Sequence, residues 1–150
     1  MSISTTGADR RLFIPALRGL YSNLHDGAET LLRVVAGGAL VIHGAPKIID
    51  PFGATGMVES LGFYPGVLWA PLLAITEFFG GILLILGLFT RPAALAATFV
   101  LLVTVWFHWI TQGQGYSGAE KSILWAAILF FFFVRGGNRH SVDARIGKEF

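Results

Sequence analysis

Residues 67–88, VLWAPLLAITEFFGGILLILGL, form an apolar run with a single carboxylate, that of Glu77, near its middle. At about 1.5 Å rise per residue this run reaches about 33 Å as a helix, and the hydrocarbon core of a bilayer is about 30 Å thick. The run therefore predicts a membrane-spanning helix, and the rest of the chain is organised around it.

Glu77 is the side chain that needs an explanation at this depth. An ionised carboxylate near the middle of a bilayer costs about 3 kcal/mol on insertion scales, so we expect Glu77 to face other helices, water or a bound partner, or to be protonated. Two interpretations stay open. Glu77 either takes part in binding, or it makes a hydrogen bond that only holds helices together.

The composition is that of a membrane protein. Of the 150 residues, 54% are hydrophobic and 13% are charged, and the mean hydropathy is +0.67. A soluble domain carries about 25% charged residues. The net charge of +2 does not indicate nucleic acid, because the charges flank apolar segments. Cysteine is absent, which excludes thiol chemistry by the chain itself and leaves any redox reaction to a bound molecule.

Four apolar segments predict an all-α integral membrane protein, a bundle of four transmembrane helices. The expected spans are residues 29–49, 67–88, 93–110 and 120–135. Thr90 is the expected cap of the third span, and residues 111–120 are expected to form a flexible loop.

Two terminal segments lie outside this membrane domain of residues 29–135. Residues 1–28 form an N-terminal extension, in which Phe13, Leu17, Leu20 and Leu24 recur at the spacing of an interfacial helix; a frayed tail is the alternative. Residues 136–150 are expected to be a polar cytoplasmic tail.

The basic residues predict the orientation. With both termini in the cytoplasm, only two basic residues, Lys47 and Lys121, lie on the outer side, and Arg33 lies within the first span near its inner end. The inner side then carries Arg10, Arg11, Arg18, Arg91, Arg135, Arg139, Arg145 and Lys148. Because positive charge is enriched on the cytoplasmic side, we expect a multi-pass protein of a bacterial-type inner membrane, with both termini inside.

Polar side chains gather in the outer half of the predicted bundle. Counting along the helices puts five candidate ligand-binding residues there: Glu77, His43, Lys47, His108 and Glu120. Small residues allow helices to approach closely, and we expect one glycine pair of the first span to pack against a pair of the second. These pairs are Gly37 with Gly38 and Gly80 with Gly81.

Several kinds of chemistry suit this cluster. A carboxylate and a histidine can bind and protonate a quinone headgroup. His43 and His108 could in principle ligate a haem, but nothing marks a haem cleft, and no Glu-x-x-His or His-x-x-x-His pair supports a metal site. In the alternative without a ligand, His43 and Glu77 satisfy each other's hydrogen bonds. No residue is assigned a catalytic role.

Residues spread over most of the chain resemble the DoxX family of small four-helix membrane proteins. The most specific part is Glu77-x-x-Gly-Gly-x-x-Leu-x-x-Gly. The matching positions are Arg33, Gly37, His43, Gly44, Lys47, Glu77, Gly80, Gly81, Leu84, Gly87, Thr90, Arg91, Gly115, Tyr116, Glu120, Gly136, Ser141 and Asp143. The family takes its name from a subunit associated with quinol oxidase and thiosulfate:quinone oxidoreductase systems, and other members are linked to oxidative stress and thiol homeostasis.

The resemblance implies fold more firmly than reaction. We expect an accessory or quinone-linked component of a redox or oxidative-stress membrane complex, without independent catalytic activity. The alternative is a non-catalytic scaffold that recruits partner proteins and uses Glu77 only for packing. The expected contacts are the lipid bilayer, other membrane or soluble redox proteins and further copies of the chain; no nucleic-acid partner is expected.

Overall fold

A computed structural model describes residues 13–148, and this part of the chain is helical with no strand. Four helical segments are long and apolar enough to cross a membrane: Pro15–Ile49, Gly66–Leu86, Thr90–Thr111 and Gly115–Arg135. The predicted all-α fold with four spans is therefore confirmed.

The helices differ from the predicted spans mainly at their first residues. The long helices are α1 (Arg18–Ile49), α3 (Gly66–Leu86), α4 (Thr90–Trp106) and α5 (Gly115–Arg135). The shorter elements are a 3-10 turn η2 (Pro15–Leu17), α2 (Thr55–Ser60), a π-helical turn η3 (Phe107–Thr111) and α6 (Val142–Ile146). The helices α1 and α5 begin earlier than predicted, within polar segments that were expected to lie outside the spans.

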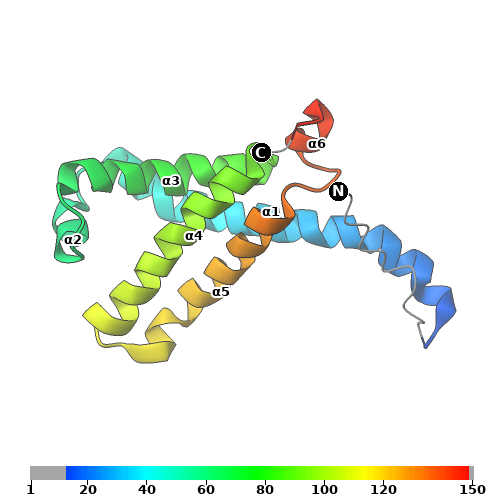
Figure 1. Cartoon of the computed structure of the whole chain (residues 1–150), viewed down its shortest axis with the longest axis horizontal. Coiled ribbons are helices and arrows are strands. Elements are labelled where there is room, and N and C mark those ends of the chain that lie inside the picture. Colours follow the sequence, from blue (N-terminus) through cyan, green and yellow to red (C-terminus); the bar gives the residue numbers. More distant parts are fainter. Residues whose placement is uncertain (1–12, 149–150) are drawn as a thin grey trace.

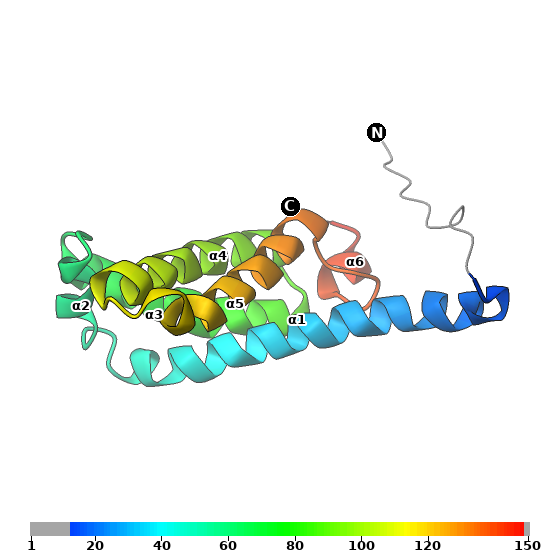
Figure 2. The same ribbon diagram turned by 90° about the horizontal axis from the view of Figure 1, so that it is seen from below.

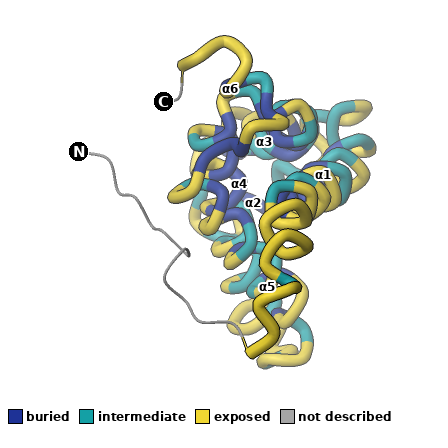
Figure 3. Tube along the Cα trace, turned by 90° about the vertical axis from the view of Figure 1, so that its right-hand side faces the viewer, coloured by how far each residue is buried: buried dark blue, intermediate teal, exposed yellow. Residues whose placement is uncertain are grey.

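The first correction concerns the N-terminal extension. Its described part is no separate interfacial helix, because α1 runs without a break from Arg18 into the predicted span (Figure 2). Figure 3 views the molecule from the end where α1 begins, and the first turns of α1 are exposed there.

The second correction concerns the predicted loop at residues 111–120. Residues 115–120 already belong to α5, where Ala119 is completely buried.

The four long helices pack as two pairs. α1 packs along α3 and α4 packs along α5, and the pairs meet mainly through α3 and α4, whereas α1 and α5 touch over only a short length. In Figure 1 the two pairs diverge toward the end of the molecule that carries α2. We call this the α2 end, and the opposite end, where α6 lies, the tail end. The core lies where the pairs converge and consists of Ala36, Leu40, Leu84, Ala93, Ala94, Ala97, Leu129 and Phe132.

Glycines set the close approach of α1 and α3. A Cβ atom added to Gly37 would lie 2.6 Å from the carbonyl oxygen of Gly81, and one added to Gly81 would lie 2.7 Å from that of Gly37. A Cβ atom added to Gly44 would likewise meet the backbone of α3, at 2.5 Å from the amide nitrogen of Phe78. Gly38 and Gly80, by contrast, would meet nothing within 4 Å. One glycine of each predicted pair thus lies at the helix contact.

This difference predicts a contrast between adjacent alanine substitutions. Gly37→Ala forces two backbones apart, and we expect it to lower the free energy of unfolding by about 2 kcal/mol, as overpacking does. Gly38→Ala is the matched control and should be neutral or stabilising by up to about 1 kcal/mol, because alanine has the higher helix propensity. SDS-induced loss of helix in mild detergent, followed by circular dichroism, measures both. Equal stability of the two variants would contradict the packing.

The segment after α5 also corrects the sequence-based prediction. Residues 136–150 were expected to form a polar tail, but the described part folds back on the bundle, and Asn138, Ser141 and Asp143 are buried. The carboxylate of Asp143 accepts hydrogen bonds from the backbone amides of Phe89 and Thr90, each at 2.9 Å, and from the Thr90 hydroxyl at 2.8 Å. Asp143 therefore caps α4, the role predicted for Thr90.

Arg33 lies beside this cap and is 1% exposed. Its Nη1 donates to the carbonyl oxygen of Leu84 at 2.8 Å, and its Nη2 donates to that of His140 at 3.4 Å. Nη1 fills the space next to Gly87, where an added Cβ would lie only 2.0 Å from it. Gly87 also has a φ of +69°, which favours glycine. The first span, the end of α3 and the tail therefore meet at one guanidinium.

Candidate functional site

A cavity of about 610 Å³ lies between the two helix pairs, toward the α2 end, and all of α1 to α5 contribute to it. Its walls are mostly apolar and aromatic, as in sites for small organic molecules. The side chains that line it with polar groups are His43, Lys47, Thr76, Glu77, Thr104, His108, Lys121 and Ser122. The cavity lies where α1 and α5 no longer contact each other, whereas α1 and α3 stay in contact through Gly37, Gly44 and Gly81.

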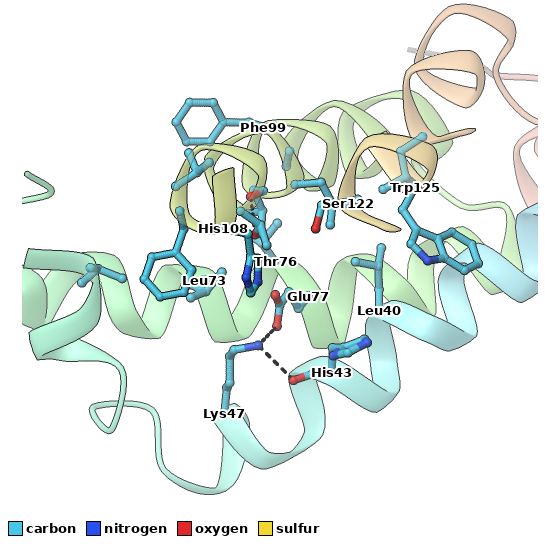
Figure 4. Close-up of a pocket in the computed structure, with 18 of the residues that line it drawn as sticks. Leu40, His43, Lys47, Leu73, Thr76, Glu77, Phe99, His108, Ser122 and Trp125 are labelled. Carbon is cyan, nitrogen blue, oxygen red and sulfur yellow. Dashed lines mark hydrogen bonds and ion pairs between the residues drawn. The ribbon is translucent and has the colours of Figure 1, made fainter. Parts of the chain in front are cut away.

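Glu77 and Lys47 form an ion pair at the wall of this cavity. Glu77 is 7% exposed on α3, and its Oε2 accepts a hydrogen bond from the ammonium of Lys47 on α1 (Figure 4). The same ammonium donates to the carbonyl oxygen of His43 at 3.1 Å, one turn earlier in α1. Lys47 therefore points into the bundle, and its charge compensates the buried carboxylate, as an ionised group in a membrane requires.

His43 lines the cavity without binding Glu77. Its side chain is exposed, and within residues 13–148 no hydrogen bond joins its imidazole to the carboxylate. The hydrogen bond to Glu77 that was considered for His43 is made by Lys47, whose longer side chain reaches the carboxylate from the next turn of α1. The imidazole of His43 stays available at the edge of the cavity.

His108 enters the cavity from the opposite wall. It lies in η3, and in Figure 4 its imidazole points toward the region of Thr76 and Glu77. Its Nδ1 lies 3.0 Å from Oε1 of Gln114, the residue just before α5. This contact orients the ring, so that its second nitrogen is left for a molecule in the cavity.

Glu120 does not join the other predicted residues. It is exposed and does not line the cavity, whereas its neighbours Lys121 and Ser122 do. The stripe of α5 that faces the cavity runs through Gly118, Ser122, Trp125 and Leu129, at helical spacing. The sequence-based prediction missed Ser122 because spacing alone does not give the face of the span that turns toward the cavity.

The connection between α1 and α3 covers the α2 end of the cavity. Val58 of α2 lines it, and the ring of Phe63 lies 5.2 Å from that of Trp69 and 6.3 Å from that of Phe99, between ring centroids. Glu59 holds this connection in place, since its Oε1 accepts a hydrogen bond from the Gly66 amide at 2.8 Å. The cavity is thus covered by aromatic side chains at the end nearest the membrane surface.

The arrangement favours an amphipathic organic molecule over a metal ion. Among residues 13–148 no group of three or more histidine, cysteine or acidic side chains is placed to hold a metal. Hydrogen-bond donors and one carboxylate converge instead on a space with apolar walls. Such a site can orient a ring that carries oxygen acceptors while its apolar part packs on side chains.

Two comparisons relate this chain to known proteins. The model of the DoxX family matches residues 28–109, which include His43, Lys47, Glu77 and His108 but end before α5. A protein of Haemophilus influenzae (strain ATCC 51907 / DSM 11121 / KW20 / Rd), described only as uncharacterized, is 30% identical over 79% of this chain and 90% of its own length. No solved structure matches.

Proposed function

Because this chain belongs to the DoxX family of membrane proteins, we propose that it is an accessory, quinone-linked component of a redox membrane complex, and that its cavity binds the quinone. The observation that carries this proposal is the cavity itself: one space with apolar walls, at hydrocarbon depth, onto which Glu77, Lys47, His108 and Ser122 converge. A quinone has the matching chemistry, an apolar ring with carbonyl oxygens that accept hydrogen bonds.

Each polar residue has a role in this proposal. Lys47 and Ser122 donate hydrogen bonds to the carbonyl oxygens of the quinone. Glu77 holds Lys47 in place, and His108 offers the ring nitrogen that does not face Gln114 as a hydrogen-bonding group for the quinone. The chain has no cysteine to serve as an electron donor, so in this proposal the electrons come from another component of the complex. Glu120 has no part, since it lies outside the cavity.

The distribution of charge supports an inner-membrane protein with both termini in the cytoplasm. Basic residues of the described part gather toward the tail end: Arg18, Arg91, Arg135, Arg139, Arg145 and Lys148. Arg10 and Arg11 lie outside the described residues. Lys47 and Lys121 lie toward the α2 end. Under the positive-inside rule the tail end faces the cytoplasm, so the cavity lies in the outer half of the membrane.

A glutamine at position 77 tests the proposed site. Glu77→Gln keeps the shape of the side chain but removes the charge that holds the Lys47 ammonium, and we expect quinone affinity to fall about 10- to 100-fold, the worth of one hydrogen bond to a charged group. The measurement is the quinone that co-purifies in mild detergent, by solvent extraction and mass spectrometry, with titration of decylubiquinone against tryptophan fluorescence.

Glu120→Gln is the matched control, because it removes a carboxylate outside the cavity and should bind as the wild type does. Unchanged affinity of Glu77→Gln would refute the site. If no quinone co-purifies and decylubiquinone leaves both fluorescence and melting unchanged, the scaffold function is favoured. The Lys47–Glu77 pair is consistent with that alternative, because the two residues already neutralise each other across the contact of α1 and α3.

A further inference from the structure

We propose that the cavity receives its ligand from within the membrane, through the gap between α1 and α5; this inference rests on the proposed function. A ligand that enters there is a membrane-dissolved amphiphile, and one dissolved in water is excluded. The cavity could open between α1 and α5, between α3 and α4, or at the α2 end. The packing and chemistry of these three sides decide which of them admits a ligand.

The gap between α1 and α5 is the least packed of these sides. α1 packs along α3, α4 packs along α5, and α3 contacts α4, but α1 and α5 touch over only a short length. Residues on both edges of the gap line the cavity, Leu40 and His43 from α1 and Lys121 and Trp125 from α5. In Figure 4 Leu40 and Trp125 face each other across the space between these helices. His43 and Lys121 are exposed although they line the cavity, so the cavity reaches the surface between them.

The α2 end and the side between α3 and α4 carry mostly apolar side chains, of which Met57, Leu72 and Phe99 are exposed. α2 lies across the end nearest the membrane surface, and Met57 and Val58 line the cavity from it. The ring of Phe63 lies 5.2 Å from that of Trp69 on α3 and 6.3 Å from that of Phe99 on α4, between ring centroids. It therefore spans the space between these two helices. A solute that arrives from the aqueous phase would therefore have to displace an aromatic cluster.

The gap is open on the α2 side of Leu40. His43 and Lys121, nearest the α2 end, are exposed, whereas Leu40 and Leu129 lie deeper and are buried in the core. Leu40 is about 14 Å along α1 from Ile49, at 1.5 Å per residue, which puts it within the hydrocarbon core. An amphiphile that enters on the α2 side of Leu40 meets the polar groups with its ring and leaves its apolar chain on the lipid side.

Two alanines allow a matched test of the route. Ala39 lines the cavity on the edge of α1 away from α3, because Gly37 and Gly44 mark the edge that faces α3. Ala127 is exposed on α5 and does not line the cavity. In liposomes, with decylubiquinone as the probe and stopped-flow quenching of tryptophan fluorescence as the signal, we expect Ala39→Phe to slow association about tenfold, as a blocked approach does. Ala127→Phe should leave the rate within about a factor of two of the wild-type rate.

The outcomes separate this inference from the proposed function. Slowing by Ala127→Phe alone, equal slowing by both variants, or slowing by neither overturns the route between α1 and α5 but leaves quinone binding intact. Absence of any quenching in the wild type refutes quinone binding itself.

A second measurement does not need the ligand. The chain has no cysteine, so Ala39→Cys carries a single thiol. A nitroxide spin label is attached to this thiol in detergent, and after transfer to liposomes we expect molecular oxygen, which concentrates in hydrocarbon, to relax it more strongly than a water-soluble nickel chelate does. Stronger relaxation by the nickel chelate would show that water fills the gap, which contradicts entry from the membrane.

Discussion

Replacing Arg33 by methionine is expected to lower the free energy of unfolding by about 3 kcal/mol, the usual loss when one member of a buried charged network is removed. Methionine keeps most of the apolar stem but donates no hydrogen bond. The Leu84 carbonyl at the end of α3 and the His140 carbonyl in the tail then both lose their donor, at a position that is 1% exposed in the wild type. Asp143 also loses the positive charge that attracts it.

Arg145→Met is the matched control, since Arg145 is exposed in α6 and its loss should change stability by less than about 0.5 kcal/mol. The measurement is the SDS concentration at half loss of helix in mild detergent. Arg33→Met should also make the tail more accessible to trypsin, because the Arg33 Nη2 hydrogen bond joins α1 to His140 at the start of the folded tail. A stability equal to that of Arg145→Met would refute the role of Arg33.

Hydropathy and helical spacing predict the parts of the fold that depend on local sequence. The run at residues 67–88 is long and apolar on all sides, so its span was predicted to within two residues at the C-terminal end, Leu86 against residue 88. The depth of Glu77 followed from its place within that run. The contact of Gly37 with Gly81 follows from small residues on two adjacent spans, but which glycine of each pair lies at the contact depends on how the helices are rotated, and sequence alone does not give that rotation.

Long-range polar contacts are the part that local pattern could not predict. Arg33 bonds residues 51 and 107 positions away, so nothing near it in the sequence indicates that it is buried. The tail has the polar composition of an exposed segment, yet its Asn138, Ser141 and Asp143 are buried, because hydrogen bonds to the bundle replace those to water. Ser122 was missed for another reason. It lies inside the predicted fourth span, but the face of that span that turns toward the cavity depends on how the helix is rotated against its neighbours.

Asp143→Ala is expected to cost about 2–4 kcal/mol of unfolding free energy, and it tests whether the tail is part of the folded bundle. The carboxylate is 3% exposed and satisfies the amides of Phe89 and Thr90, whose positive helix end at α4 attracts a negative charge. Alanine leaves both amides and the Thr90 hydroxyl without their acceptor. The loss therefore exceeds that of an exposed helix cap.

Two variants apportion this effect. Asp143→Asn keeps one acceptor oxygen but removes the charge, so we expect a loss between those of the wild type and Asp143→Ala. Thr90→Val removes only the hydroxyl bond at 2.8 Å and should cost about 1 kcal/mol. If Asp143→Ala melts as the wild type does, the tail does not stabilise the bundle. If it costs no more than Thr90→Val, the carboxylate acts through the hydroxyl alone and does not cap α4. We expect the loss of unfolding free energy to rise from Thr90→Val to Asp143→Asn to Asp143→Ala. A larger loss in Asp143→Asn than in Thr90→Val identifies the cap as a charged one, because asparagine keeps an acceptor oxygen but carries no charge.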